Sequence, residues 1–183
     1  SPRYTGPVEI GKSARFRATA LREGGENASY SREFAFSKST GRPAVLNTKP
    51  NDSYTFEGAS LLVDGYHSRP VFTSGAWLGY LDEPLDVTID MGGEQSYRSV
   101  ELETLAEKGD WIFPPSSVTV WVSDNGTDFT EVASVAVPEA KAGDADGIGR
   151  YRMQFPETSA RYLKVVAQNA AAIPAWHPGA GSK

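Results

Sequence analysis

Short runs of alternating hydrophobic and polar residues follow one another along most of the chain, as in half-buried β-strands. Residues 85–91 place Leu, Val, Ile and Met on one side and two Asp and a Thr on the other, and Gly92-Gly93 ends this run. Comparable runs occupy residues 100–102, 118–122, 132–137, 150–155 and 161–167. Asn125-Gly126 supplies the residues that a tight hairpin turn favours. No stretch keeps a helical period, so the pattern predicts an all-β fold, a β-sandwich or jelly roll.

The first 43 residues form a separate pattern. Residues 14–21 and 30–36 alternate on either side of a loop containing Gly24-Gly25, which predicts a β-hairpin. Two strands cannot bury a core of their own. Residues 1–37 are therefore expected to be the C-terminal part of another small β-domain, or to pack on the remainder of the chain. The polar segment 38–43, with Gly and Pro, is expected to be a linker, and residues 44–183 to form the main domain.

Composition narrows the function classes. The 183 residues carry a net charge of −5 and no cysteine, so disulfides, thiolate metal sites and cysteine catalysis are excluded. No basic cluster suggests a nucleic-acid partner, and no apolar run reaches the roughly 18 residues of a transmembrane segment. Secreted eukaryotic domains of this size often carry disulfides. The lack of cysteine therefore favours a bacterial protein that is secreted, periplasmic or on the cell surface. Because the chain starts at Ser1 and not Met, inside a strand-turn pattern, we also expect it to be a fragment.

An ordered series of motifs carries a family resemblance. It comprises Leu62-Val63-Asp64-Gly65, Trp77, the strand at 85–92, Trp111-Ile112-Phe113-Pro114, the segment 118–129 with its Ser-Asp-Asn-Gly turn, and Arg161-Tyr162-Leu163-Lys164-Val165. Over about residues 41–183 the chain resembles the coagulation-factor-5/8 C-type (discoidin) domain, also known as the family 32 carbohydrate-binding module. The resemblance implies a discoidin-like, galactose-binding-like β-sandwich.

A narrower resemblance concerns the parent protein. Tyr4-Thr5-Gly6-Pro7, the segment 14–18 and the run 173–181 are similar to the C-terminal region of bacterial family 20 glycoside hydrolases, the β-N-acetylhexosaminidases. This resemblance implies that residues 1–37 end a small, chitobiase C-terminal-like β-sandwich. Two departures stand out, because the family's last strand would follow Lys183 and is missing, as is the start of the small domain.

The sequence favours a non-catalytic chain. Family 20 enzymes use an adjacent Asp-Glu pair in a barrel, but here Asp82-Glu83 precedes Pro84, which indicates a surface turn. A (β/α)₈ barrel needs about 250 residues. The two histidines, His67 and His177, lie in no nucleophile-elbow motif.

The resemblance implies a structural calcium ion at the Asp-Gly loop. Its carried-over ligand is Asp64, assisted by Thr73 or Ser74 and nearby carbonyls, in keeping with the oxygen ligands that Ca²⁺ prefers. The alternative is that Asp64-Gly65 is simply a turn.

Sugar binding needs an aromatic plate with polar groups around it, and three loop groups are candidates. These are Tyr66-His67, Trp111 and Trp176-His177, all outside the alternating runs. The alternative for the tryptophans is packing beneath the loops, since aromatic residues are buried on average.

These observations favour two functions. The chain is expected to be a carbohydrate-binding accessory module of a secreted glycoside hydrolase, for glycans with a terminal hexosamine or galactose-type sugar. Its other expected partner is the catalytic domain of its own parent chain. The alternative is a structural module that packs on the catalytic barrel and binds no sugar. A protein- or membrane-binding discoidin role ranks last, because the candidate loops lack a basic cluster.

Overall fold

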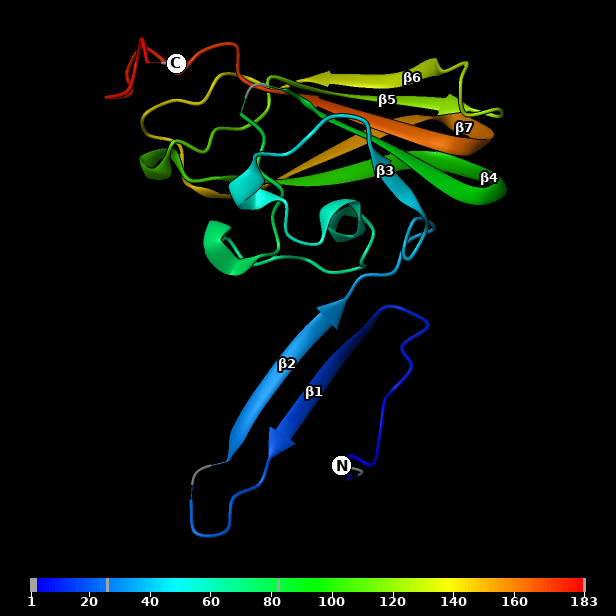
Figure 1. Ribbon diagram of the computed structural model, residues 1–183, viewed down its shortest axis with the longest axis vertical. Helices are drawn as coiled ribbons and strands as arrows, with labels where there is room; N and C mark the ends of the chain where they lie inside the picture. Colours follow the sequence, from blue (N-terminus) through cyan, green and yellow to red (C-terminus); the bar gives the residue numbers. More distant parts are fainter. Residues whose placement is uncertain (1–2, 26, 82, 183) are drawn as a thin grey trace.

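The computed structural model describes residues 3–25, 27–81 and 83–182, and within them the fold is all-β, as predicted (Figure 1). Loops and short 3-10 helices, labelled η, join the strands. In chain order the elements are β1 (Ala14–Ala20), β2 (Ala28–Phe34), β3 (Ala44–Leu46), η1 (Asp52–Tyr54), η2 (Gly58–Leu62), η3 (Phe72–Ser74), β4 (Leu85–Ala106), η4 (Lys108–Asp110), β5 (Ser117–Ser123), β6 (Thr130–Ala136) and β7 (Gly147–Gln168). None of the helices in these ranges has the length and hydrophobicity that crossing a membrane requires.

Two long strands, β4 and β7, form the centre of the main domain. Each has 22 residues, and they pair antiparallel from Leu85↔Ala167 to Ala106↔Gly147. The ladder is interrupted between Asp90 and Gln95, where the ribbon bends over, so that one strand pair contributes to both layers of the sandwich (Figure 1). β3 pairs with β4, β5 with β7 and β6 with β5, giving the order β3-β4-β7-β5-β6.

The core lies between the two layers of this bent ribbon. Val87, Ile89 and Met91 before the bend pack in one hydrophobic cluster with Met153 and Phe155 beyond it. The fully buried side chains of this cluster include Met91, Val118 and Val120. Burying each such side chain stabilises the fold by about 1.5–3 kcal/mol, so the alternation predicted from the sequence is also the main source of stability.

The strand boundaries differ from the prediction at the bend. Gly92-Gly93 was expected to end a strand, yet β4 continues through it. Gly92 adopts φ 78°, and its N–H donates to Asp90 Oδ1 at 2.9 Å, which turns the chain without ending the ladder. Arg161 of β7 donates to both oxygens of Asp90 and holds the pKa of this carboxyl at about 2. The runs 150–155 and 161–167 likewise belong to one strand, with Pro156 near the bend.

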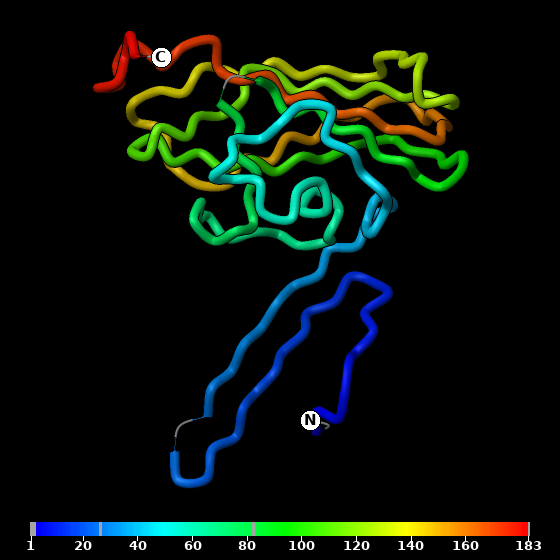
Figure 2. The backbone as a smooth tube through the Cα atoms, viewed as in Figure 1, coloured from blue at the N-terminus to red at the C-terminus, as the bar shows by residue number. Residues whose placement is uncertain are grey.

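The N-terminal hairpin predicted from the alternation is confirmed, and it projects from the sandwich (Figure 2). The pairing register places eight residues on one face: Ala14, Phe16, Ala18, Ala20, Ala28, Tyr30, Arg32 and Phe34. The other face carries polar contacts such as the Arg15–Glu33 ion pair. Only Phe16 and Phe34 of the mostly apolar face are even half-buried, so this face remains largely uncovered by the described residues.

Tyr66 anchors the hairpin to the sandwich. Its ring lies 4.7 Å from that of Phe34 between centroids, and the Arg32 guanidinium lies 3.7 Å above it. The segment predicted as a linker also contacts the main domain. Gly41 N–H donates to the Val63 carbonyl at 2.7 Å, and Lys38 Nζ donates to the Ser96 carbonyl at 2.6 Å.

We predict that Tyr66→Ala loosens the hairpin while leaving the sandwich folded. The lost ring and cation–π contacts contribute about 1.4 kcal/mol, so tryptic cleavage in the hairpin should become roughly tenfold faster. A gel time course under native conditions measures this rate. Tyr30→Ala removes an exposed ring from the same face of the hairpin and is the matched control. Equal cleavage rates for the two variants would show that Tyr66 is not the anchor.

Candidate functional site

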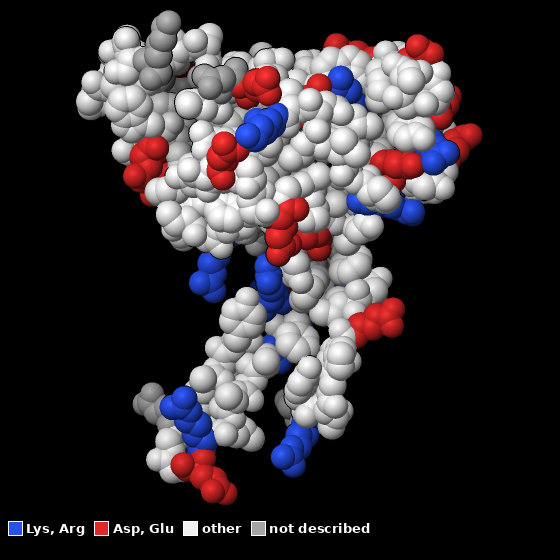
Figure 3. All heavy atoms as spheres, viewed as in Figure 1, with Lys and Arg blue, Asp and Glu red and all other residues white. Residues whose placement is uncertain are grey.

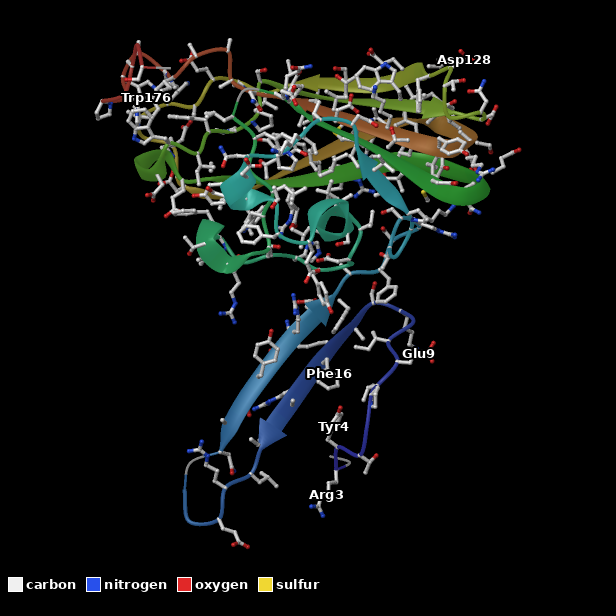
Figure 4. All side chains as sticks on the ribbon, in the orientation of Figure 1. Arg3, Tyr4, Glu9, Phe16, Asp128 and Trp176 are labelled. Carbon is white, nitrogen blue, oxygen red and sulfur yellow. The ribbon has the colours of Figure 1, made fainter. Side chains whose placement is uncertain are left out.

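Four aromatic side chains gather at one end of the sandwich, and we call them the aromatic cluster: Trp111, Phe113, Trp176 and His177. The His177 ring is central, with centroid distances of 5.4 Å to Trp111, 5.2 Å to Phe113 and 5.7 Å to Trp176, each in edge-to-face geometry. Figure 4 shows Trp176 at this end and Asp128 at the other. The structure thus brings together three predicted residues, and adds Phe113, which the sequence analysis named only as part of the Trp111–Pro114 motif.

His177 organises the cluster from inside. The residue is only 7% exposed. Its Nδ1 accepts the Gly179 N–H at 3.0 Å, so Nε2 carries the ring hydrogen and donates it to the Lys108 carbonyl at 2.9 Å. Both ring nitrogens are therefore engaged within the chain, and His177 supports the tryptophans without offering a free polar atom to a ligand.

Lys108 joins three loops beneath the cluster. Its buried ammonium forms an ion pair with Asp146, whose Oδ1 also accepts the Lys108 backbone N–H at 3.1 Å. Its carbonyl accepts hydrogen bonds from the Trp111 N–H and from His177. The Lys108 hydrogen bonds hold the pKa of the Asp146 carboxyl below its usual value. No sequence signal indicates this role, because a buried lysine has the same pattern as an exposed one.

Trp111 presents a broad aromatic surface. It follows η4 with φ 65°, in the left-handed region that bulky residues rarely adopt. Its benzene ring lies so close to Gly179 that a Cβ at that position would come within 2.5 Å of Cη2. The residue is nevertheless 52% exposed, so the ring is supported from one side and open to solvent on the other.

Trp176 forms the second aromatic surface. Its Nε1–H donates to the Ala140 carbonyl at 2.8 Å, which fixes the ring against the loop before β7. Its edge-to-face contact with Phe113 has a centroid distance of 6.5 Å. With 38% of its surface exposed, Trp176 combines a satisfied polar atom with an accessible apolar face.

Two acidic residues belong to the η4 segment that leads into Trp111. Glu107 caps the start of η4 and Asp110 is its last residue, and burial, followed by the charge of Asp110, raises the pKa of Glu107. Carboxylate oxygens accept hydrogen bonds from hydroxyl groups. The end of the sandwich can therefore bind a neutral ligand that has an apolar face and hydroxyl groups at its rim.

Tyr66 and His67 lie elsewhere in the fold, and their observed ring contacts and hydrogen bonds are not with the aromatic cluster. Tyr66 anchors the hairpin through Phe34 and Arg32. His67 Nδ1 lies 2.7 Å from Glu103 Oε1, which also accepts from Arg150 Nε at 2.6 Å. The predicted role of Tyr66 and His67 in sugar binding stays a prediction.

Asp64 sits in a turn that is already extensively hydrogen bonded. Its Oδ1 accepts the Tyr66 N–H at 2.8 Å, and the flanking carbonyls of Val63 and Gly65 accept N–H groups from the segment 35–41. Burial raises the pKa of Asp64. No group of three or more His, Cys, Asp or Glu positioned for a metal occurs in the described part of the chain. A calcium ion takes six to eight oxygen ligands, many of them carbonyls, and calcium at Asp64 and Thr73 stays a prediction.

A pocket of about 420 Å³ lies beside the segment 37–39 and reaches into the sandwich. Its lining combines core side chains such as Val87 and Met91 with polar residues such as Glu157, and it includes none of the five residues predicted to bind sugar. The candidate site is thus a surface of exposed rings and not a deep pocket.

We predict that Gly179→Ala displaces the Trp111 ring. The new Cβ would overlap the ring, and overpacking of this kind costs about 1–3 kcal/mol. A lower Tm and a changed tryptophan emission spectrum should report it. Gly143→Ala makes the same change where no atom lies within 4 Å and is the control. A Gly179→Ala variant that matches this control would contradict the packing described.

We predict that Asp146→Asn destabilises the protein in a pH-dependent way. Because the folded-state pKa of Asp146 is lowered, its contribution is present above the unfolded pKa, near 3.8, and is lost as the pH falls through the folded value. The Tm difference between the two proteins should therefore be clear at pH 7 and shrink below about pH 4. A difference that stays constant down to pH 3 would mean that the ion pair does not contribute.

Comparisons with known proteins give the family. The F5/8 type C domain model matches residues 46–182. Among solved structures, chitosan-binding module 2 of a chitosanase/glucanase from Paenibacillus sp. IK-5, in complex with chitotriose, has a TM-score of 0.49 at 16% identity, covering 75% of this chain and 91% of that one. Module CpGH89CBM32-5 from Clostridium perfringens, in complex with GalNAc-β-1,3-galactose, has a TM-score of 0.46 at 17% identity, covering 70% and 85%. A comparison with curated proteins found no match.

Because the family model spans well over half of the sequence, this chain belongs to the F5/8 type C domain family.

Proposed function

We propose that this chain is a non-catalytic carbohydrate-binding module and that Trp111 and Trp176 form its sugar-binding surface. The observation that carries the proposal is the pair of exposed indole rings, 52% and 38% accessible, held in place by buried groups. The apolar face of a pyranose stacks on such rings, and the carboxylates of Glu107 and Asp110 can accept its hydroxyl hydrogens.

The immobilised rings favour binding. Gly179, His177 and the Ala140 carbonyl restrict the two indoles before any ligand arrives. A ligand therefore does not have to order these side chains, and that ordering otherwise costs about 0.5–1.5 kcal/mol for each. Weak stacking contacts can then give measurable affinity.

The proposal assigns no catalysis to this chain. Of the Asp82-Glu83 pair, Asp82 lies outside the described residues, while Glu83 accepts the Lys49 backbone N–H at 3.2 Å. Charges of both signs are scattered over the face drawn in Figure 3. A neutral ligand suits such a surface better than a polyanion.

We further propose that the parent is a secreted bacterial glycoside hydrolase, a β-N-acetylhexosaminidase, and that the ligand ends in a hexosamine or galactose-type sugar. Its support is the sequence resemblance at Tyr4-Thr5-Gly6-Pro7, residues 14–18 and residues 173–181. Tethering to an enzyme would raise the local concentration of its substrate even when the module alone binds weakly.

The hairpin favours a second role, as a structural contact. The described residues leave its mostly apolar face largely uncovered, and a two-stranded hairpin is marginally stable at best without a packing partner. The parent's neighbouring domain is the expected partner. This role and sugar binding use different surfaces, so they are compatible.

We predict that calorimetric titration detects millimolar or tighter binding of N-acetylglucosamine, N-acetylgalactosamine or galactose. Trp111→Ala and Trp176→Ala should each weaken it by roughly 5- to 30-fold, because a stacked ring contributes about 1–2 kcal/mol. Titrations with calcium and then with chelator test the metal separately. Tyr30→Ala, an exposed ring on the hairpin, is the control and should bind as the unsubstituted chain does. If the folded protein binds none of these sugars, sugar binding is contradicted and only the structural role remains.

A further inference from the structure

Two non-glycine residues of the described chain have positive φ angles, Phe56 at 37° and Trp111 at 65°. Both are aromatic, and both are exposed, by 46% and 52%. Trp111 already belongs to the proposed sugar-binding surface. Phe56 shares its unusual backbone and its exposure but has no role in the aromatic cluster.

The backbone of Phe56 is costly for a residue of its type. A β-carbon in the left-handed region clashes with the neighbouring backbone, and a bulky residue there is an outlier. Gly or Asn would occupy the position with little strain, so the conformation alone does not select Phe. Burial does not explain the ring either, because nearly half of its surface faces solvent.

The ring of Phe56 has packing contacts of its own, although they are looser than those of Trp111. It lies beside Gly75, where an added Cβ would be in ordinary van der Waals contact, 3.5 Å from Cδ1. The Tyr54 ring meets it edge-on at 6.3 Å between centroids. Tyr54 is itself fixed, because its carbonyl accepts the Gly79 N–H at 3.2 Å and its ring leaves no room for a Cβ on Gly79.

Polar residues lie next to Phe56 and Gly75 in the chain. Glu57 follows Phe56 in the chain, and Thr73 and Ser74 precede Gly75, all three with exposed surface. Phe56 thus combines an exposed ring with an acidic neighbour in the chain, as Trp111 does with Asp110, and Gly75 adds the hydroxyl residues that precede it. In Figure 1, η1 and η3, which flank Phe56 and Gly75, lie toward the end of the sandwich that carries η4 and the C-terminal loop.

We propose that Phe56 is a second sugar-stacking subsite, so that the module binds an oligosaccharide along this end and not a single sugar. The inference rests on the proposed function and extends it to a ligand of several linked pyranose units. In this proposal, one pyranose unit of the oligosaccharide stacks on the Trp111 and Trp176 surface, and another unit stacks on Phe56.

The test compares ligand lengths by calorimetry. N-acetylglucosamine is titrated beside its β-1,4-linked hexamer, and galactose beside its β-1,4-linked hexamer. Phe56→Ala should bind the hexamer of the recognised series 5- to 30-fold more weakly and its monosaccharide within twofold of the unsubstituted chain. Val71→Ala, which removes an aliphatic side chain of equal exposure from the same region, is the control and should change neither.

A second readout separates a ligand-binding role from a packing role. Phe56→Asn relieves the backbone strain, so its Tm should be unchanged or higher by roughly 2–4 °C, while hexamer binding weakens. A Tm that falls by several degrees would assign Phe56 to packing and overturn the proposal. Unaltered hexamer binding in both Phe56 variants would overturn the second subsite and leave the first, whereas no binding by the unsubstituted chain would overturn both.

Discussion

The hydrogen-bonded ladder between β4 and β7 determines where everything else in the main domain lies. β3 and β5 add to its two sides, and its bend after Asp90 folds the ribbon over its own apolar face. The same register places Ala106 opposite Gly147 at its far end. Lys108 and Asp146 therefore emerge side by side, and their ion pair is a direct consequence of the pairing.

The Lys108–Asp146 ion pair explains how the loops beneath the aromatic cluster can be held in place without a large hydrophobic core of their own. A buried ammonium costs several kcal/mol unless it is paired and hydrogen bonded, so the fold holds Asp146 to it closely. The Lys108 carbonyl then accepts hydrogen bonds from the Trp111 backbone N–H and the His177 ring, and these bonds fix the positions of both residues. Hydrophobic burial stabilises the sandwich, whereas a few polar contacts set the geometry of the exposed rings.

The sequence predicted the elements whose hydrophobic and polar residues alternate regularly. Alternation located the strands and the hairpin, and the loop positions of Trp111 and Trp176 placed them at the candidate site. It could not predict the bend, because Gly92-Gly93 is equally typical of a turn that ends a strand. It also could not distinguish a buried His177 from an exposed one, since that depends on Lys108, some 70 positions away in the chain. The φ angle of Phe56 leaves no trace in composition or periodicity.

The two surfaces left open by the fold are unlike each other, and this difference bears on the proposed function. The hairpin offers an Ala-rich face with an Arg–Tyr contact at its base, which suits another sheet. The end of the sandwich with the aromatic cluster offers two exposed indole rings in a segment that also carries Glu107 and Asp110, which suits a hydroxylated ring better than a protein core. A module anchored through the first surface would keep the second free to bind. Because the Tyr66 contacts and the hydrogen bonds of the segment 35–41 fix the hairpin to the sandwich, a domain packed on the hairpin would also have a fixed orientation relative to the candidate site.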